Sequence, residues 1–240
     1  VEETDRRGRT IRTTRNKDEK RGTPQGAPIS PLLSNLYMRR FVLGWKVVGH
    51  EQRLDAHIFK YADDFVICCR GTADEAMTAL RTIMGKLRLT VNEQKTRQCR
   101  IPDESFDFLG YTIGCCGHRP QGGPPQTGEA YIATRPSQKT ITRLCREISE
   151  RTSRRWSLLP VEDRVAQINR KLIGWSNYFC LGPVSKAYRA VDRHVCHRLR
   201  QWFVCQAHGA GSGNLTLSRR ALNQTLGVVQ LPARTRNFSW

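Results

Sequence analysis

Two adjacent aspartates, Asp63 and Asp64, lie between two apolar segments rich in β-branched and aromatic residues, 56–60 and 65–69. Such segments are typical of β-strands, and the short polar stretch between them predicts a tight hairpin turn. Because the turn holds no basic residue, its two like charges favour a bound cation, and carboxylate oxygens favour Mg²⁺. An aspartate pair is also good turn chemistry by itself, so this simpler interpretation stays open.

The charge of the chain points to a polyanionic partner. Forty Lys and Arg against 21 Asp and Glu give a formal net charge of +19, which favours RNA, DNA or an anionic membrane surface. No apolar run is long enough to span a bilayer. Nine cysteines occur without a Cys-x-x-Cys pair, which argues against a zinc ribbon and predicts reduced thiols in the cytoplasm. The chain starts at Val1 without a signal peptide, so we expect a piece of a longer protein.

The first half predicts an α+β domain. A charged strand–loop arm (1–21) precedes a turn-rich segment and a helix over 32–38 capped by Ser30. After the hairpin, Thr72 begins a capping box, and apolar spacing predicts a helix to about residue 87. We expect short strands at 89–91 and 97–101, one strand over 106–113 and a turn at 114–117.

The second half predicts a small helical bundle after a Gly- and Pro-rich linker. Three apolar stripes at helical spacing lie between residues 137 and 202, and Ser137 is a plausible N-cap. Residues 135–205 carry 15 Lys and Arg against 5 Asp and Glu. The predicted domain bounds are 1–116 for a partial sheet domain, 117–129 for the linker, 130–206 for the bundle and 207–240 for a tail whose fold is not predicted.

Several motifs follow one another in a set order. They are Gly22-Thr23-Pro24-Gln25-Gly26, Ser30-Pro31-Leu32-Leu33-Ser34-Asn35, Tyr61-Ala62-Asp63-Asp64, Asn92-Glu93-Gln94-Lys95-Thr96, Phe108-Leu109-Gly110-Tyr111 and Gly174-Trp175-Ser176-Asn177-Tyr178-Phe179. This series resembles the group II intron-encoded reverse transcriptases with their maturase (domain X, or thumb) region, over about residues 20–205. The resemblance implies a polymerase palm followed by a helical thumb. It also implies RNA-directed DNA synthesis from deoxynucleoside triphosphates, binding of intron RNA, an RNA template and a DNA primer, and a mobile element that splices with the protein's help.

The resemblance also implies roles for individual residues. Asp63 would ligate two Mg²⁺ ions with Asp64 as its supporting neighbour, in the general two-metal scheme. Lys95 would protonate pyrophosphate, although a solvated charge at a strand end remains an alternative. The residues expected near the nucleotide or primer, of which Phe108 and Leu109 are core residues in either case, are Gln25, Gly26, Tyr61, Phe108, Leu109, Gly110 and Tyr111.

The bundle offers candidates for RNA binding. Arg170 and Lys171 lie off the apolar stripe of the second helix, and Arg189, Arg193 and Arg200 share one face of the third. A solvated face is the alternative for the last three. The aromatic residues Trp175, Tyr178 and Phe179 are more often core than base-stacking platforms.

The match has a gap that leaves two functions open. The family's palm needs another aspartate on an upstream strand, and the acidic residues before Gly22 all lie in the charged arm. We therefore expect this chain alone to polymerise poorly and its full-length parent to be an RNA-directed DNA polymerase. The alternative is a non-catalytic, RNA-binding maturase that assists splicing. The sequence does not predict an oligomeric state.

Overall fold

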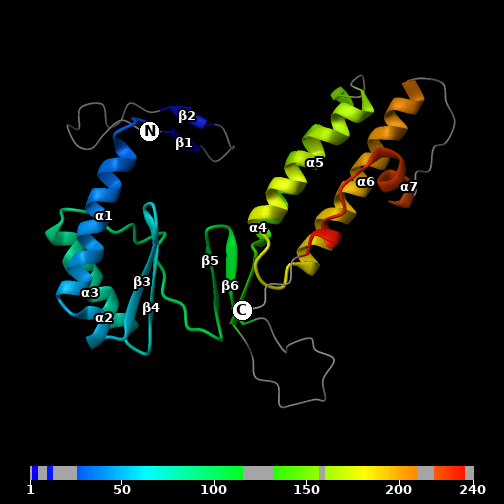
Figure 1. Cartoon of the computed structure of the whole chain (residues 1–240). Helices are drawn as coiled ribbons and strands as arrows, with labels where there is room; N and C mark the ends of the chain where they lie inside the picture. Colours follow the sequence, from blue (N-terminus) through cyan, green and yellow to red (C-terminus); the bar gives the residue numbers. More distant parts are fainter. Residues whose placement is uncertain are drawn as a thin grey trace, which may run out of the picture. The chain divides into compact units, whose positions relative to one another are not determined.

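The chain folds into two compact units of helices and short antiparallel sheets. The computed structural model describes residues 2–4, 10–12, 26–115, 132–156, 160–209 and 219–235. The units are Val1–Gln98 and Cys99–Trp240. Helices and antiparallel strands occur in both, which confirms the α+β class (Figure 1). The predicted domain bounds remain a prediction, since compactness divides the chain at residue 98 rather than near 116.

The first unit combines a β-hairpin with helices. Its elements are β1 (Glu2–Thr4), β2 (Thr10–Arg12), α1 (Ser30–Val47), α2 (His50–Arg53), β3 (Ala56–Tyr61), β4 (Asp64–Cys69) and α3 (Ala73–Lys86). The strands pair antiparallel, β1 with β2 and β3 with β4. The predicted hairpin and the predicted helix that follows it are therefore both present.

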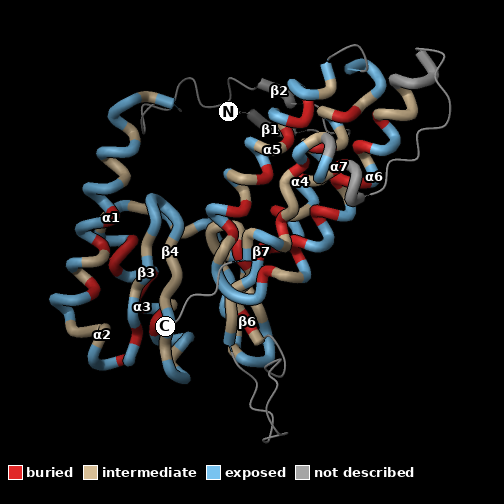
Figure 2. Tube along the Cα trace, turned by 45° about the vertical axis from the view of Figure 1, so that its right-hand side comes forward, coloured by how far each residue is buried: buried red, intermediate tan, exposed pale blue. Residues whose placement is uncertain are grey.

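The core of this unit lies between α1, α3 and one face of the hairpin. Its buried residues (red in Figure 2) include Phe41 and Trp45 of α1 and Ala56 at the start of β3. The indole Nε1 of Trp45 donates to the carbonyl oxygen of Ala56 at 2.9 Å, so the ring is both buried and satisfied. Truncating such a buried tryptophan to alanine costs about 3–5 kcal/mol.

Two predicted helix caps are wrong. Ser30 is the first residue of α1, because Ile29 already has helical φ and ψ and no side chain caps the helix. Thr72 occupies the N-cap of α3, but its hydroxyl oxygen accepts no hydrogen bond from the helix N–H groups, and the hydroxyl instead donates to the carbonyl oxygen of Leu54 at 2.8 Å. The Thr72 hydroxyl is thus directed to Leu54, and the predicted capping box does not form.

The strands predicted at 89–91 and 97–101 are also wrong, because neither segment pairs with a described strand. Leu89 and Val91 pack against the core without joining a ladder. A further correction concerns 106–113, which is a hairpin rather than one strand. Its turn is at Leu109 and Gly110, and Gly114 lies within the second strand rather than in a turn.

The second unit is a helical bundle joined to a three-stranded sheet. Its elements are β5 (Ser105–Phe108), β6 (Tyr111–Cys115), β7 (Ile132–Pro136), α4 (Gln138–Arg151), η1 (Arg154–Trp156), α5 (Val161–Tyr178), α6 (Ser185–Gly209), α7 (Arg219–Leu226) and η2 (Leu231–Arg234). The sheet is antiparallel in the order β5-β6-β7. The hydroxyl of Ser137 accepts from the backbone N–H of Thr140 at 3.3 Å, which confirms that predicted cap.

The bundle core confirms the predicted apolar stripes. All five predicted residues of α6 are buried, with Tyr188 fully inaccessible to solvent. The C-terminal segment adds Leu222, Val228 and Leu231 to the same core. Asn169 of α5 holds this segment by accepting from the N–H of Val229 at 2.9 Å. Much of the predicted tail is therefore part of the bundle.

Candidate catalytic turn and nucleic-acid interface

The two aspartates lie at a two-residue hairpin turn. Tyr61 pairs with Asp64 at the end of the ladder, so Ala62 and Asp63 form the turn itself. Ala62 has φ +53, the left-handed conformation that primed hairpin turns require and that side chains disfavour. A non-glycine residue held there stores about 1–3 kcal/mol of strain, of the kind found at functional sites.

The ladder register gives the hairpin a covered face and an open face. Residues paired across the ladder lie on the same face, and Ile58 with Ile67 packs on the helical core. Phe59 and Tyr61 are on the other face and are 58% and 64% exposed. Since Asp64 is the cross-strand partner of Tyr61, it belongs to the open face as well.

No described cation neutralises the two carboxylates. Neither Asp63 nor Asp64 forms an ion pair within the described residues, and both are exposed. The nearest lysine in sequence, Lys60, lies on the covered face and donates to Asn35 Oδ1 of α1 at 3.2 Å. The turn is therefore an exposed, acidic site, and the strand before it is hydrogen-bonded to α1 through Lys60.

The donor set of the turn suits a hard divalent cation, but it is small. Carboxylate oxygens are the ligands that Mg²⁺ prefers, and this ion commonly binds one or two carboxylates while keeping water. Among the described residues no group of three or more His, Cys, Asp or Glu side chains gathers as a metal site. Asp63 and Asp64 thus fit a magnesium site to which they supply part of the ligands.

Lys95 lies in a separate turn. Asn92 organises it, since its Oδ1 accepts from the N–H groups of Gln94 and Lys95 at 3.1 and 3.2 Å. Arg81 of α3 makes a two-pronged ion pair with Glu93 at 3.0 Å, and this partner lowers the pKa of the Glu93 carboxyl. Within the described part, no ion pair or hydrogen bond joins the Lys95 ammonium to the aspartates.

The predicted nucleotide-side loop is described only in part. Gln25 lies outside the described residues. Gly26 has φ +85, and a Cβ built on it meets nothing within 4 Å. The glycine is therefore required by backbone conformation rather than by crowding within the described chain.

The segment Phe108–Tyr111 forms the tip of the β5–β6 hairpin in the second unit. Phe108 pairs with Tyr111, and both central residues are left-handed, Leu109 at φ +51 and Gly110 at φ +80. Positive φ at both positions is the mark of a type I′ turn.

The turn is hydrogen-bonded to the end of α5, which lies far from it in the sequence. The Tyr178 hydroxyl donates to the Leu109 carbonyl at 3.0 Å, and the Tyr111 hydroxyl donates to the Tyr178 carbonyl at 2.5 Å. Burial raises the pKa of Tyr111, which keeps this hydroxyl a donor. Of the predicted core aromatics, Phe179 is buried, whereas Tyr178 is 54% exposed.

The predicted RNA-binding residues are all exposed, but they differ in their partners. Lys171 Nζ lies 3.0 Å from Glu147 Oε2 of α4, so part of its charge is compensated. Arg170 beside it has no partner in the described residues. Arg189, Arg193 and Arg200 lie on α6 with exposed side chains.

A cationic cluster that the sequence did not predict lies at the turn between α4 and α5. Arg155 and Arg164 place their guanidinium carbons 5.2 and 5.3 Å from the Trp156 ring centroid. Arg164 is only 3% exposed, and burial, followed by the charge of Arg151, lowers its pKa. The available signal was Trp156 directly after Arg154 and Arg155.

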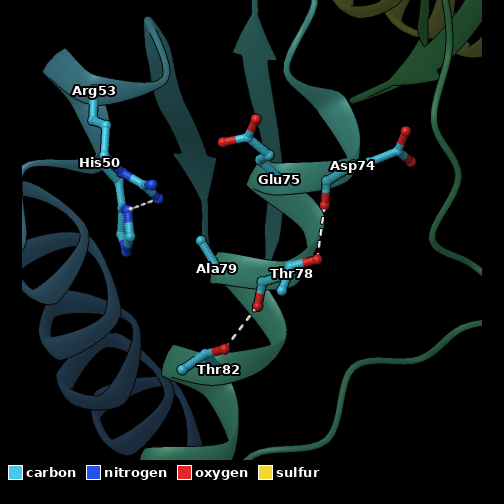
Figure 3. Close-up of a pocket in the computed structure, with 7 residues that line it drawn as sticks. All are labelled: His50, Arg53, Asp74, Glu75, Thr78, Ala79 and Thr82. Carbon is cyan, nitrogen blue, oxygen red and sulfur yellow. Dashed lines mark hydrogen bonds between the residues drawn. The ribbon is translucent and has the colours of Figure 1, made fainter.

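A pocket of about 450 Å³ lies on the first unit, away from the predicted site residues. His50 and Arg53 of α2 form one side and residues of α3 the other (Figure 3). None of the residues predicted for catalysis or primer binding lines it. The pocket therefore does not bear on the acidic turn.

Two family models match the chain. Residues 7–113 match "Reverse transcriptase (RNA-dependent DNA polymerase)", and residues 141–219 match "Group II intron, maturase-specific domain". A comparison with curated proteins finds no match. Within the described residues, no helix is long and apolar enough to cross a membrane. The two matched regions stand in the order that the motifs predict, and the chain therefore belongs to the group II intron reverse transcriptase/maturases.

Proposed function

We propose that Asp63 and Asp64 hold Mg²⁺ for RNA-templated DNA synthesis. The observation that carries the proposal is the exposed pair of carboxylates on a strained turn, without an ion pair to any cation of the described residues. The family match supports nucleic acid as the substrate and favours the enzyme over a maturase that only binds RNA. Bound magnesium would activate the primer 3′-hydroxyl and stabilise the departing pyrophosphate.

The surrounding residues have separate proposed tasks. Tyr61, on the same open face as Asp64, would contact the primer terminus. Gln25 and Gly26 would lie against the incoming deoxynucleoside triphosphate, where the missing Cβ of Gly26 permits close backbone approach. Lys95, whose side chain is exposed, would donate a proton to pyrophosphate.

The second unit would hold the duplex and the intron RNA. Phe108, Leu109, Gly110 and Tyr111 would present their turn to the primer strand. The exposed arginines of α5 and α6 would contact phosphates, with binding that weakens steeply as salt increases. We propose that the protein acts in the reducing cytoplasm, since no cysteine in the described residues is part of a disulfide.

The decisive experiment replaces one oxygen ligand. We expect Asp63→Asn to reduce primer extension on an RNA template by roughly a thousandfold in the full-length protein, because catalytic charge stabilisation is lost. The enhancement of water-proton relaxation by protein-bound Mn²⁺ should also fall, and this measurement reports metal binding without catalysis. Asp103→Asn, in another exposed turn, is the matched control and should change neither. Unchanged extension by Asp63→Asn would remove this residue from the metal site.

A further inference from the structure

The backbone of the Phe108–Tyr111 turn is hydrogen-bonded to the bundle at two positions. Both of its central carbonyls accept hydrogen bonds, one from α5 and one from the start of α4. The Leu109 carbonyl accepts from the Tyr178 hydroxyl at the end of α5. The Gly110 carbonyl accepts from the Ser137 N–H at 2.9 Å and from the Thr140 hydroxyl at 3.3 Å.

The side chains at this contact are packed as closely as its backbone. A Cβ on Gly110 would lie 3.0 Å from Phe179 Cζ and 3.1 Å from Thr140 Oγ1. Tyr111 contacts Phe179 with ring centroids 5.0 Å apart, and its hydroxyl returns a bond to the Tyr178 carbonyl. Bonds thus run in both directions between segments 67 to 69 residues apart.

The end of α5 is itself fixed on its other side. The buried Tyr188 hydroxyl of α6 donates to the carbonyls of Ser176 and Phe179, both at 3.0 Å. Arg234 of η2 donates to Ser176 Oγ at 2.8 Å and to Asn177 Oδ1 at 2.9 Å. The segment Ser176–Phe179 therefore bridges the hairpin turn, α6 and the C-terminal segment.

The two family regions meet at this bridge. Residues 108–111 fall within the reverse transcriptase match, whereas Tyr178 falls within the maturase-specific match. In the structure the hairpin belongs to the same compact unit as the bundle. A displacement of the end of α5 would therefore act directly on the turn through these hydrogen bonds.

We infer that Tyr178 is a positioning residue, which fixes the Phe108–Tyr111 turn at the primer terminus through its hydroxyl. The inference rests on the proposed function, because that function assigns the turn to the primer. The primer geometry of the polymerase then depends on a side chain of the maturase region. Arg234 supports the same segment from the C-terminal side.

The test removes only the bond. Tyr178→Phe keeps the ring that contacts Phe179 and deletes the hydroxyl. The control is Thr152→Val, which removes a buried hydroxyl at the opposite end of α4, where it donates to Ile148. Urea unfolding measures the stability that each variant loses, so that differences in binding can be compared at equal folded fraction.

Two measurements on the full-length protein separate positioning from stability. The first is the KM for an RNA template–DNA primer hybrid against kcat, and the second is the fluorescence of 2-aminopurine at the primer 3′ end. We expect Tyr178→Phe to raise this KM about tenfold, the effect of one hydrogen bond, with kcat within about twofold. It should also brighten the 2-aminopurine as the terminus loosens, while Thr152→Val should do neither.

The two proposals fail in different ways. If Tyr178→Phe matches Thr152→Val in KM and in fluorescence, the positioning role is overturned although the polymerase remains. If the wild-type protein neither binds nor extends the hybrid, the proposed function is wrong, and the positioning role is overturned with it. A kcat that falls with unchanged KM and fluorescence also overturns the inference.

Discussion

Replacing Gly110 by alanine should destabilise the second unit through two separate effects. With φ +80, any L-residue at this position carries a left-handed penalty of about 1–2 kcal/mol. The added methyl also meets the ring of Phe179 at 3.0 Å, and overpacking of this kind costs about 1–3 kcal/mol. Alanine restricts the unfolded chain and offsets about 0.4–1 kcal/mol. We therefore expect a net loss of about 2–4 kcal/mol.

Two other glycines of the same unit isolate these effects. Gly227 has φ +64 and open space around its missing Cβ, so Gly227→Ala shows the backbone penalty alone, about 1 kcal/mol after the entropy offset. Gly174 lies within α5, where a Cβ meets nothing within 4 Å. Gly174→Ala should stabilise the unit by about 0.5–1 kcal/mol, since alanine is the better helix former.

Urea unfolding followed by tryptophan fluorescence measures all three variants. Trp175 lies 5.1 Å from Phe179 between ring centroids, so its emission reports this region directly. The expected order of stability is Gly174→Ala, wild type, Gly227→Ala and Gly110→Ala. If Gly110→Ala is no less stable than Gly227→Ala, Phe179 does not pack on the turn, and the contact between turn and bundle is refuted.

Three further predictions test the site and its surroundings. Ala62→Gly should relieve the turn strain and change stability by at most about 1 kcal/mol, measured by urea unfolding, whereas a loss above that shows the alanine methyl packs. Burial lowers the pKa of His194 below 6.5, so the unfolded state binds more protons and the protein becomes less stable as the pH drops below 6.5. His194→Gln should flatten this loss of stability in unfolding measured at several pH values. An unchanged profile would contradict the prediction. Arg170→Ala should reduce the slope of log affinity for intron RNA against log salt by about 0.7–0.9, whereas Glu147→Gln should strengthen binding by releasing Lys171, and equal slopes in all proteins exclude these phosphate contacts.

The parts of the fold that sequence predicted are those with a strong apolar period. The α6 stripe from Tyr188 to Trp202 is buried at every predicted position, because a spacing of three or four residues places all of them on one side of a helix. The Asp63–Asp64 hairpin was predictable for the equivalent reason, since two β-rich runs were separated by too few residues for another connection.

The predictions of local structure that are wrong lie where a tertiary contact competes with a local preference. Thr72 has the right spacing for a capping box, yet its hydroxyl bonds to Leu54, 18 residues away. Leu89 and Val91 have the composition of a strand, yet they pack, partly buried, against the core without a described partner strand. Local patterns carry no information about which distant group lies nearby, so these outcomes depended on the structure.

The Trp175–Phe179 motif shows why residue type did not decide between packing and binding. Phe179 is buried against the Gly110 turn, as expected for a core residue, but Tyr178 next to it is more than half exposed. The exposed ring nevertheless has a structural bond through its hydroxyl. Burial therefore places Phe179 in the core, whereas a base-stacking role for the exposed Tyr178 ring stays a prediction.

Matched regions and compact units divide this chain at different places, and that difference has a physical origin. The reverse transcriptase match extends to residue 113, while the first compact unit ends at Gln98. A family match covers a continuous stretch of sequence. A compact unit is instead defined by contacts in space, such as the hydrogen bonds from Tyr178 and Ser137 to the Leu109–Gly110 turn. If those bonds set the boundary, Tyr178→Phe combined with Thr140→Val should increase amide exchange in 105–115 while leaving 26–98 unchanged. Equal exchange in the variant and the wild type would mean that these two hydroxyl bonds do not hold the hairpin, and that strand pairing with β7 and the backbone bond from Ser137 suffice.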